Sequence, residues 1–342
     1  MSTTLETAPT AATAAASATC APKSSPEAAV GVHPRRATAA FPDCPARLSA
    51  EQVAQFERDG YLAFENFLTP IEVAALTAGM SRMVATIAGA VRAGQGTMQP
   101  GNWMGMKNYS GLRMSTPGSK ADLLFEPGVS FDLAQVTDAE LETWVRKFSF
   151  PTEGDPAWGM LAQHPRLLPL IEGLLGPGPI LFGDMALCKP ARIGVAKPWH
   201  QDHAYFCYEP IGAGVDVWIA LEDATVENGC MQVLPGGHRL GPKKHVHRDD
   251  CEIEAGRMDI SRAVPAELKA GGVLLFSVML PHFTPPNTSS YSRRSGQLFY
   301  RGANTRLVSN EEHGNAFREA DGTPASCHGI DVKPEKSGKS EG

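Results

Sequence analysis

The chain has 342 residues, of which 42% are hydrophobic and 20% are charged, and its formal net charge is −6. This composition is that of a globular protein with enough apolar residues for one large domain or two small ones. The negative charge argues against nucleic acid as a partner, and the lack of a run of about 18 apolar residues argues against a membrane helix. We therefore expect neither nucleic acid nor membrane among its partners.

Seven cysteines are scattered along the chain, without a CxxC pair. An odd number of cysteines at irregular spacing is not typical of a disulfide scaffold or of a cysteine-built zinc site. The cysteine pattern therefore predicts a reducing compartment, and we expect a cytoplasmic location.

The two ends of the chain differ from its middle. Residues 1–44 are rich in Ala, Thr and Pro and contain no aromatic residue before Phe41, and residues 331–342 are polar. Segments of this kind bury too little apolar surface to offset the entropy that they lose on ordering. We therefore expect disordered ends around one folded domain at residues 45–330.

Two helix starts are predicted near the beginning of that domain. Ser49 with Gln52 three positions later forms a possible capping box, and Gly60 is a natural end for this helix, after which "YLAFENFL" reads as a strand. The next helix begins at Thr69, followed directly by proline and, at the third helical position, by Glu72. This order of residues is a strong helix-start signal.

From about residue 179 the sequence changes to short apolar runs separated by Gly, Pro, Asn and Asp, such as "PILFGDMALCKP", "VDVWIALEDA" and "GGVLLFSVML". Many short strands after a block of helices indicate a barrel or a sandwich with helices packed outside. Residues 90–150 are irregular and predict a long loop or a lid. The predicted fold class is an all-β core with flanking helices (α+β).

The stretch "AKPWHQDHAYF" places His200, Asp202 and His203 within four positions. Residues i and i+2 of a strand share a face, so we expect His200 and Asp202 to point to one place and His203 to point away. One imidazole and one carboxylate are two of the three ligands of a 2-His-1-carboxylate iron site, which leaves three coordination positions open. Because HxD is frequent by chance, a polar strand edge is the alternative.

A third ligand would have to come from a distant strand. His282 ends the apolar run "GGVLLFSVMLPH", which predicts a buried strand that delivers the imidazole to an interior. A hydrogen-bonded core histidine is the alternative for this position. His238 has the setting of a turn residue, and His245 and His247 lie in "KKHVHRDD", a stretch typical of a solvated face.

Arg293 and Arg294 open the strand-like run "RRSGQLFY". A buried strand that starts with arginine needs an anionic partner, because an unpaired interior charge is costly. A guanidinium can bind a ligand carboxylate through two hydrogen bonds. The alternative is a pair of surface arginines, and for Arg294 we adopt it.

Several of these motifs occur together in one known family. The segments "WHQD", "NGCMQVLPGGH", "GGVLLFSVMLPH", "PPN" and "SRR" stand in the order and spacing of the phytanoyl-CoA dioxygenase (PhyH) family. The opening "LSAEQVAQFERDGYLAFENFLTPIEVAAL" also resembles that family, and the likeness covers roughly residues 48–305. The combination of motifs is far more specific than any one of them.

The resemblance implies a double-stranded β-helix (jelly-roll, cupin-like) enzyme that uses Fe(II), 2-oxoglutarate and O₂. Carried over position by position, it makes His200, Asp202 and His282 the iron ligands. Arg293 becomes the residue that holds the distal carboxylate of 2-oxoglutarate. Further cofactor-binding positions are implied at Trp218, Thr284 and Asn287. A lysine also contacts the cosubstrate in some members, and Lys107 and Lys120 are the candidates for it.

The implied function is that of a non-haem Fe(II)/2-oxoglutarate-dependent dioxygenase, an oxidoreductase that in the simplest case hydroxylates a C–H bond of a small-molecule substrate. A fairly apolar substrate is expected because aromatic and methionine residues gather in two stretches. These residues are Trp103, Met104, Met106, Tyr109, Trp199, Tyr205, Phe206 and Tyr208. Richness in Ala, Gly, Pro and Arg suggests a setting in secondary metabolism.

Two other function classes stay open at this point. A zinc-dependent hydrolase could use the same His/Asp/His triad with a bound water. A catalytically silent small-molecule binding protein could have the same fold. The sequence leaves the substrate's identity and the oligomeric state unknown.

Overall fold

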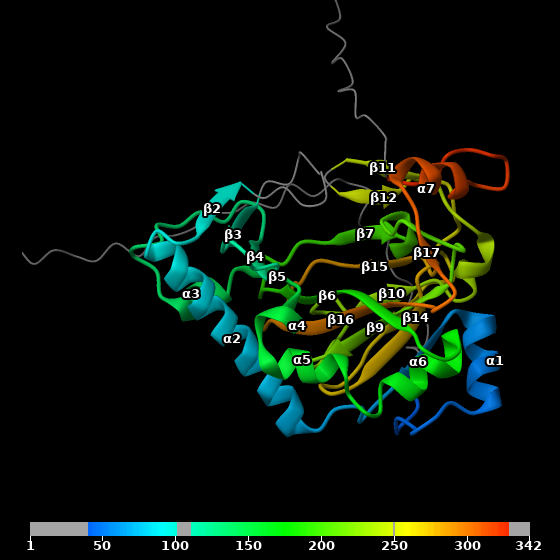
Figure 1. The fold of residues 1–342 in the computed structure, drawn as a ribbon, viewed down its shortest axis with the longest axis horizontal. Coiled ribbons are helices and arrows are strands. Elements are labelled where there is room, and N and C mark those ends of the chain that lie inside the picture. The colour runs from blue at the N-terminus through cyan, green and yellow to red at the C-terminus, as the bar shows by residue number, and fades with distance from the viewer. Residues whose placement is uncertain (1–39, 101–110, 249, 328–342) are drawn as a thin grey trace, which may run out of the picture.

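The computed structural model describes residues 40–100, 111–248 and 250–327. Two antiparallel sheets, one of nine strands and one of four, make up its centre, and most of the helices lie along one side of the larger sheet (Figure 1). This arrangement confirms the predicted all-β core with flanking helices.

The larger sheet is antiparallel between all of its neighbours. Its strands, in spatial order, are β1 (Tyr61–Phe64), β14 (Val273–Ser277), β9 (Gly214–Ala220), β16 (Arg293–Arg301), β6 (Ile180–Lys189), β5 (Val145–Ser149), β4 (Asp122–Phe125), β3 (Leu112–Ser115) and β2 (Thr97–Pro100). The strands β2 to β5 come from the region 90–150, which was expected to be irregular. That expectation was wrong because these strands are only four or five residues long and mix polar or charged with apolar residues.

The smaller sheet and two ribbons complete the β structure. The four strands of the smaller sheet are β13 (Val264–Ala266), β10 (Met231–Val233), β15 (His282–Thr284) and β7 (Lys197–His200). The ribbons are β11 (His245–His247) with β12 (Cys251–Ile253), and β17 (Arg306–Leu307) with β8 (Tyr208–Glu209).

The two faces of the larger sheet have different chemistry. Side chains alternate between the faces of a strand, and Phe148, Ala186 and Leu298 join the apolar core on one of them. On the opposite face, Gln297 of β16 reaches a carboxylate that follows β7 of the smaller sheet. Polar groups of the larger sheet are therefore directed between the two sheets.

The first two of the seven helices in the described residues begin where the sequence predicts them. The seven are α1 (Ala50–Asp59), α2 (Pro70–Arg92), α3 (Asp138–Glu142), α4 (Pro151–Gly154), α5 (Pro156–Ala162), α6 (Leu168–Leu175) and α7 (Asn310–Ala316). Ser49 and Thr69 both form the expected capping boxes, in which the side chain accepts from the backbone N–H three residues later. The first helix ends at Gly60, whose φ of 85° lies in the left-handed region that favours glycine.

Among the described residues, α2 is the one helix with the length and apolarity of a membrane span, at 23 residues and a mean hydropathy of 1.3. Its buried residues include Leu76, Met80, Val84 and Ile87, which belong to the main hydrophobic core. Their spacing of three or four residues is typical of a helix that packs one face on a sheet. The contacts of α2 are therefore those of a core helix.

The folded part begins earlier than the expected boundary between residues 44 and 45. Phe41 stacks on Phe64 with the ring centroids 5.2 Å apart, and its backbone bonds to Ala63 and Glu65 at 2.9 Å. Cys44 is also buried in the main core. Residues 40–44 pack against the domain because the aromatic contact and the backbone hydrogen bonds of Phe41 offset the entropy lost when the segment becomes ordered. Residues 1–39 and 331–342, for which disorder was predicted, lie outside the described residues.

Two cysteines form a disulfide, Cys251 of β12 and Cys327, which are 76 positions apart. The cysteine pattern did not indicate this pair, since a spacing of 76 residues gives no local signal. Disulfides are rare in a reducing cytoplasm, so the pair also removes the support that the cysteine pattern lent to a cytoplasmic location.

Candidate metal and cosubstrate site

His200, Asp202 and His282 come together between the two sheets. His200 ends β7 and His282 begins β15, and the two residues face each other across these neighbouring strands. Asp202 opens a short 3₁₀ helix, Asp202–Ala204, instead of continuing the strand as the i, i+2 argument assumed. The carboxylate oxygens of Asp202 lie 3.2 Å from Nε2 of His200 and 3.6 Å from Nε2 of His282.

Backbone carbonyls fix the orientation of both imidazoles. Nδ1 of His200 lies 2.8 Å from the carbonyl oxygen of Pro198, and Nδ1 of His282 lies 3.0 Å from that of Leu280. With a proton on Nδ1 donated to the carbonyl, Nε2 keeps its lone pair and points towards Asp202. On the other side of the carboxylate, Gln297 donates from Nε2 to an Asp202 oxygen at 3.1 Å.

The charge states of these groups suit metal ligation. Burial alone would raise the pKa of Asp202, but His282 and His200 beside it bring that pKa well below its usual range. Burial, followed by the neighbouring His200, lowers the pKa of His282 to about 4. At neutral pH the site therefore offers an ionised carboxylate and a neutral imidazole, the forms in which both residue types bind metals.

The donor set fits one divalent metal ion. The three ligand atoms lie within 4.8 Å of one another and all three residues are buried. Two imidazole nitrogens and one carboxylate are the ligands typical of non-haem Fe(II) oxygenases. In the described ranges a second group, His247 with Cys251 and Cys327, has ligand atoms equally close. Its two sulfurs are joined in the disulfide and do not bind a metal in that state.

Arg293 lies in the same interior with an unsatisfied donor. Its side chain is 2% exposed, and its guanidinium donates to the Ser295 hydroxyl at 3.0 Å and lies over the Trp218 ring at 5.3 Å. Within the described residues, Nε of Arg293 and Nε1 of Trp218 have no hydrogen-bond partner. Burial lowers the pKa of Arg293 to about 10, so it stays charged at neutral pH. An anionic ligand would accept hydrogen bonds from the unsatisfied donors and would balance the buried positive charge.

Arg294 points to the opposite face of the sheet. Its guanidinium bonds to Glu222 at 2.7 Å and to Glu142 at 3.1 Å. The two adjacent arginines therefore occupy the different positions that were expected for them, although ion pairs with Glu222 and Glu142 hold Arg294 partly buried.

The other positions implied for cosubstrate contact differ from one another. Thr284 ends β15, two residues after His282, and its buried side chain belongs to the same interior. Asn287 instead anchors a loop, because its amide donates to Lys189 and Tyr291 and its oxygen accepts twice from Ser289. Since all four bonding positions of this amide are used within the chain, we revise Asn287 from a cosubstrate contact to a structural residue.

The structure places Lys189, and not the candidate Lys120, beside Arg293. Lys120 is 66% exposed and ion-paired with Glu153, and Lys107 lies outside the described residues. Lys189, which sequence reasoning missed, pairs directly with Arg293 across β6 and β16. Its Nζ donates to the carbonyl oxygens of Val195 at 2.6 Å and Thr284 at 3.5 Å. The one sequence signal for Lys189 was its position at the end of the strand-like run "PILFGDMALCKP".

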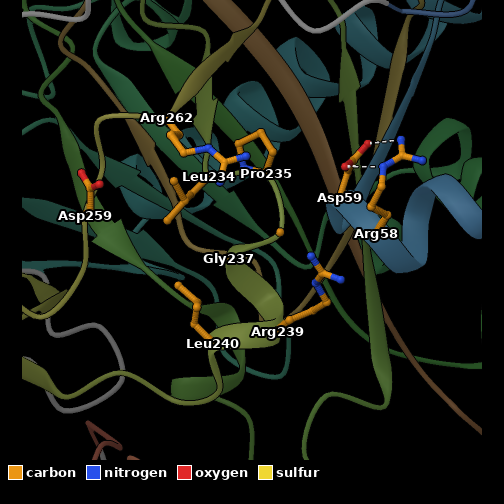
Figure 2. Close-up of a pocket in the computed structure, with 10 residues that line it drawn as sticks. Arg58, Asp59, Leu234, Pro235, Gly237, Arg239, Leu240, Asp259 and Arg262 are labelled. Carbon is orange, nitrogen blue, oxygen red and sulfur yellow. Dashed lines mark hydrogen bonds and ion pairs between the residues drawn. The ribbon is translucent and has the colours of Figure 1, made fainter.

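A surface pocket of about 550 Å³ lies elsewhere, between the end of α1 and the segment after β10 (Figure 2). It is lined by Arg58, Asp59, Arg239 and Arg262 among others, and Arg58 is ion-paired with Asp59. Neither the triad nor Arg293 lines it. The chemistry described above is therefore not that of this pocket.

The sequence is similar to known proteins over the part of the chain that forms this site. The model of the phytanoyl-CoA dioxygenase (PhyH) family matches residues 56–295. Phytanoyl-CoA dioxygenase domain-containing protein 1 of Mus musculus is 26% identical over 258 residues, which cover 72% of this chain and 88% of the mouse protein.

Solved structures with similar folds extend the comparison. EctD from S. alaskensis, in its apoform, has a TM-score of 0.56 and 22% identity over 81% of this chain and 83% of its own. SnoK, a non-heme alpha ketoglutarate dependent carbocyclase from nogalamycin biosynthesis, has a TM-score of 0.53 and 18% identity over 78% and 88%. At these identities the likeness shows the fold, and it is the jelly roll that was predicted.

Proposed function

The chain belongs to the phytanoyl-CoA dioxygenase (PhyH) family, and on that premise we propose that His200, Asp202 and His282 hold its Fe(II) and that Arg293 holds the distal carboxylate of 2-oxoglutarate. Membership makes the chain a non-haem Fe(II)/2-oxoglutarate-dependent dioxygenase. The convergence of three buried metal-ligating side chains carries the assignment of the residues.

Bound Fe(II) and 2-oxoglutarate supply the oxidising chemistry, in which O₂ is consumed, 2-oxoglutarate becomes succinate and CO₂, and a substrate C–H bond is oxidised. The chain contributes the placement of the reactants. Carbonyl oxygens hold both imidazole rings in place, and Gln297 holds the Asp202 carboxylate. Arg293, supported by Ser295 and Trp218, presents a buried positive charge to the cosubstrate.

We propose hydroxylation of a small molecule as the outcome, in a setting of secondary metabolism. Of the aromatic residues expected at the substrate, Tyr205 lies against His200 with the ring centroids 6.1 Å apart. Tyr208 is instead buried against Phe182. Trp103, Met104, Met106 and Tyr109 lie outside the described residues. Among these residues, Tyr205 therefore carries the support for a fairly apolar substrate.

Anaerobic metal binding and 2-oxoglutarate turnover test the proposal together. The protein should bind about one Fe(II), and His282→Ala should abolish both iron binding and succinate release because it removes one of three ligands. His238→Ala, at a half-buried histidine of the short 3₁₀ helix Gly237–Leu240, serves as the control and should keep both. Full succinate release by His282→Ala would contradict the ligand assignment. Substrate hydrolysis by the zinc form without 2-oxoglutarate would favour a zinc-dependent hydrolase.

A further inference from the structure

His247, Cys251 and Cys327 are a second group of metal-ligating side chains in the described part of the chain, apart from the His/Asp/His triad. Each of the three offers one ligand atom, and these atoms lie within 4.8 Å of one another. None of these residues belongs to the iron and cosubstrate site described above. The disulfide accounts for the two cysteines, but it does not account for the histidine beside them.

Strand register places the histidine next to the first cysteine. His247 of β11 is directly paired with Cys251 of β12 in the antiparallel ribbon, so the two side chains share one face. Directly paired residues have their Cβ atoms about 4.5–5.5 Å apart. An imidazole and a thiol at that separation can bind the same metal ion.

The C-terminal segment brings the second cysteine to the same place. The backbone N–H of His245 donates to the carbonyl oxygen of Ala325 at 3.0 Å, two residues before Cys327. A ring nitrogen of His247, Nε2, lies 3.1 Å from the carbonyl oxygen of Cys327. These bonds hold the segment on the ribbon independently of the two sulfur atoms, so the group stays together when the disulfide is reduced.

The distances within the group suit a zinc ion. Zn(II) binds cysteine sulfur at about 2.3 Å and histidine nitrogen at about 2.0–2.1 Å in a tetrahedral arrangement, which puts neighbouring ligand atoms about 3.5–3.8 Å apart. The spacing of the three ligand atoms is compatible with these values. The Cα atoms of Cys251 and Cys327 are 6.4 Å apart, a distance that two sulfurs on one zinc ion also span.

The chemistry of the donors distinguishes this group from the triad. Two thiolates and one imidazole favour Zn(II), whereas two imidazoles and one carboxylate are typical of non-haem Fe(II). Cys251 is 0% exposed and Cys327 is 7% exposed, while His247 is partly exposed. The histidine therefore gives the group an opening to solvent, and water can take the fourth position on the metal ion.

We propose that His247, Cys251 and Cys327 form a redox-dependent zinc site, which the disulfide closes and reduction opens. In the reduction, a dithiol gives two electrons and two protons to the sulfur pair. The S–S bond breaks, two thiols form, and the dithiol becomes a disulfide. Zn(II) then binds both sulfurs and one imidazole nitrogen, and the two thiol protons pass to solvent. The metal ion replaces the disulfide as the link between the β11–β12 ribbon and the C-terminal segment.

Co(II), as a substitute for Zn(II), tests the site in the full-length protein. The protein is reduced with a phosphine, since a dithiol would itself bind the metal, and Co(II) is titrated in without oxygen. Cobalt bound to thiolate should give a charge-transfer band in the near ultraviolet that saturates at about one Co(II) per chain and disappears when Zn(II) displaces the cobalt. The triad contains no sulfur, so cobalt bound there does not contribute. The unreduced protein should not give the band.

Variants assign the band to individual residues. Cys251→Ser and Cys327→Ser should abolish it, and His247→Ala should weaken Co(II) binding about tenfold or more because it removes one of three ligands. Cys207→Ser is the matched control, since Cys207 is a free cysteine outside the group, and it should leave the affinity unchanged. Absence of the band in the reduced, unmodified protein overturns the inference. So does a band of equal strength in Cys251→Ser and in the control.

A second measurement uses the unmodified protein alone, and it therefore does not depend on the folding of the variants. The reduced protein is treated with iodoacetamide with and without Zn(II), and the alkylated peptides are mapped by mass spectrometry. Zn(II) should slow alkylation of Cys251 and Cys327 about tenfold or more, while the half-buried Cys207 reacts equally in both samples. Equal rates at Cys251 and Cys327 with and without zinc overturn the inference. Either result leaves the proposed iron and cosubstrate residues as they stand.

Discussion

Adjacent arginines at the start of β16 serve opposite faces of the larger sheet. Arg293 is enclosed with Trp218 and Ser295 and has no acid as a direct partner among the described contacts, whereas Arg294 is held by Glu222 and Glu142. Their side chains differ in direction because successive residues of a strand alternate. One residue of register therefore separates the arginine that we propose for cosubstrate binding from an arginine held in structural ion pairs.

Replacement of the two arginines should affect different properties. Arg293→Met should raise the KM for 2-oxoglutarate about 10- to 100-fold, because it deletes a charge-assisted contact, while Fe(II) binding is kept. Arg294→Met should leave that KM unchanged and lower the melting temperature, since it removes the ion-pair partner of Glu222. Steady-state kinetics and thermal unfolding measure both. A larger KM effect in Arg294→Met would place the register of β16 one residue away from the one described.

A second residue, His245, is more important to the fold than its charged surroundings indicate. It was expected on a solvated face, but it is 0% exposed. Its Nε2 accepts from the Gln201 backbone N–H at 3.0 Å, and its Nδ1 contacts the carbonyl oxygen of Lys243 at 2.7 Å. Burial, followed by the neighbouring His200, lowers the pKa of His245 to about 3.

The depressed pKa of His245 gives a prediction for stability against pH. Between about pH 6.5, the ordinary pKa of histidine, and pH 3, the unfolded chain binds a proton that the folded chain does not. Stability is therefore full above pH 6.5 and is lost as the pH falls. At pH 5 this residue should account for a loss of about 2 kcal/mol. Urea unfolding at pH 7 and pH 5 with a chelator present measures it, and His245→Gln should remove that part of the loss. An identical pH dependence in the variant would refute it.

At the scale of elements, the β11–β12 ribbon connects the end of the described chain to the metal site. Its strand β11 bonds through His245 to Ala325, and β12 bears Cys251, whose partner is Cys327. Tyr205 also donates to the Cys251 carbonyl oxygen at 3.2 Å. The ribbon therefore lies between the metal ligands and the C-terminal segment, and the disulfide joins it to that segment.

Loss of this disulfide should lower stability without removing the metal site. A bond that closes a loop of 76 residues restricts the unfolded chain, which corresponds to about 2–4 kcal/mol. Cys251→Ser should therefore lower the melting temperature by about 5–10 °C, whereas Cys207→Ser, at a free cysteine, should change it little. Peptide mapping without reductant checks the pairing. If Cys251 and Cys327 were found as free thiols in the purified protein, the expected difference would vanish.

At the scale of the whole molecule, the N-terminal boundary can be located by truncation. The composition of residues 1–39 predicts that their removal leaves the melting temperature and succinate release nearly unchanged. Removal of residues 1–44 should lower the melting temperature by several degrees, because it also deletes the Phe41 stack on Phe64 and the buried Cys44. Equal melting temperatures for the two truncations would show that residues 40–44 add nothing to the fold.

The sequence by itself determined the features that short segments encode. The capping residues Ser49 and Thr69 marked the helix starts because their partners lie three positions away. The HxD spacing and the apolar run before His282 predicted three metal-ligating residues. Their convergence in the structure agrees with that prediction, while their role as ligands stays a prediction until iron binding is measured.

Only the tertiary structure decided which distant residues meet. Lys189 pairs with Arg293 through strand register, and Cys251 reaches Cys327 through the path of the chain. Register depends on long-range pairing between strands, and a shift of one residue would send the Arg293 side chain to the other face. Local sequence patterns contain no record of such pairing, so the lysine beside Arg293 and the disulfide became apparent only in the folded chain.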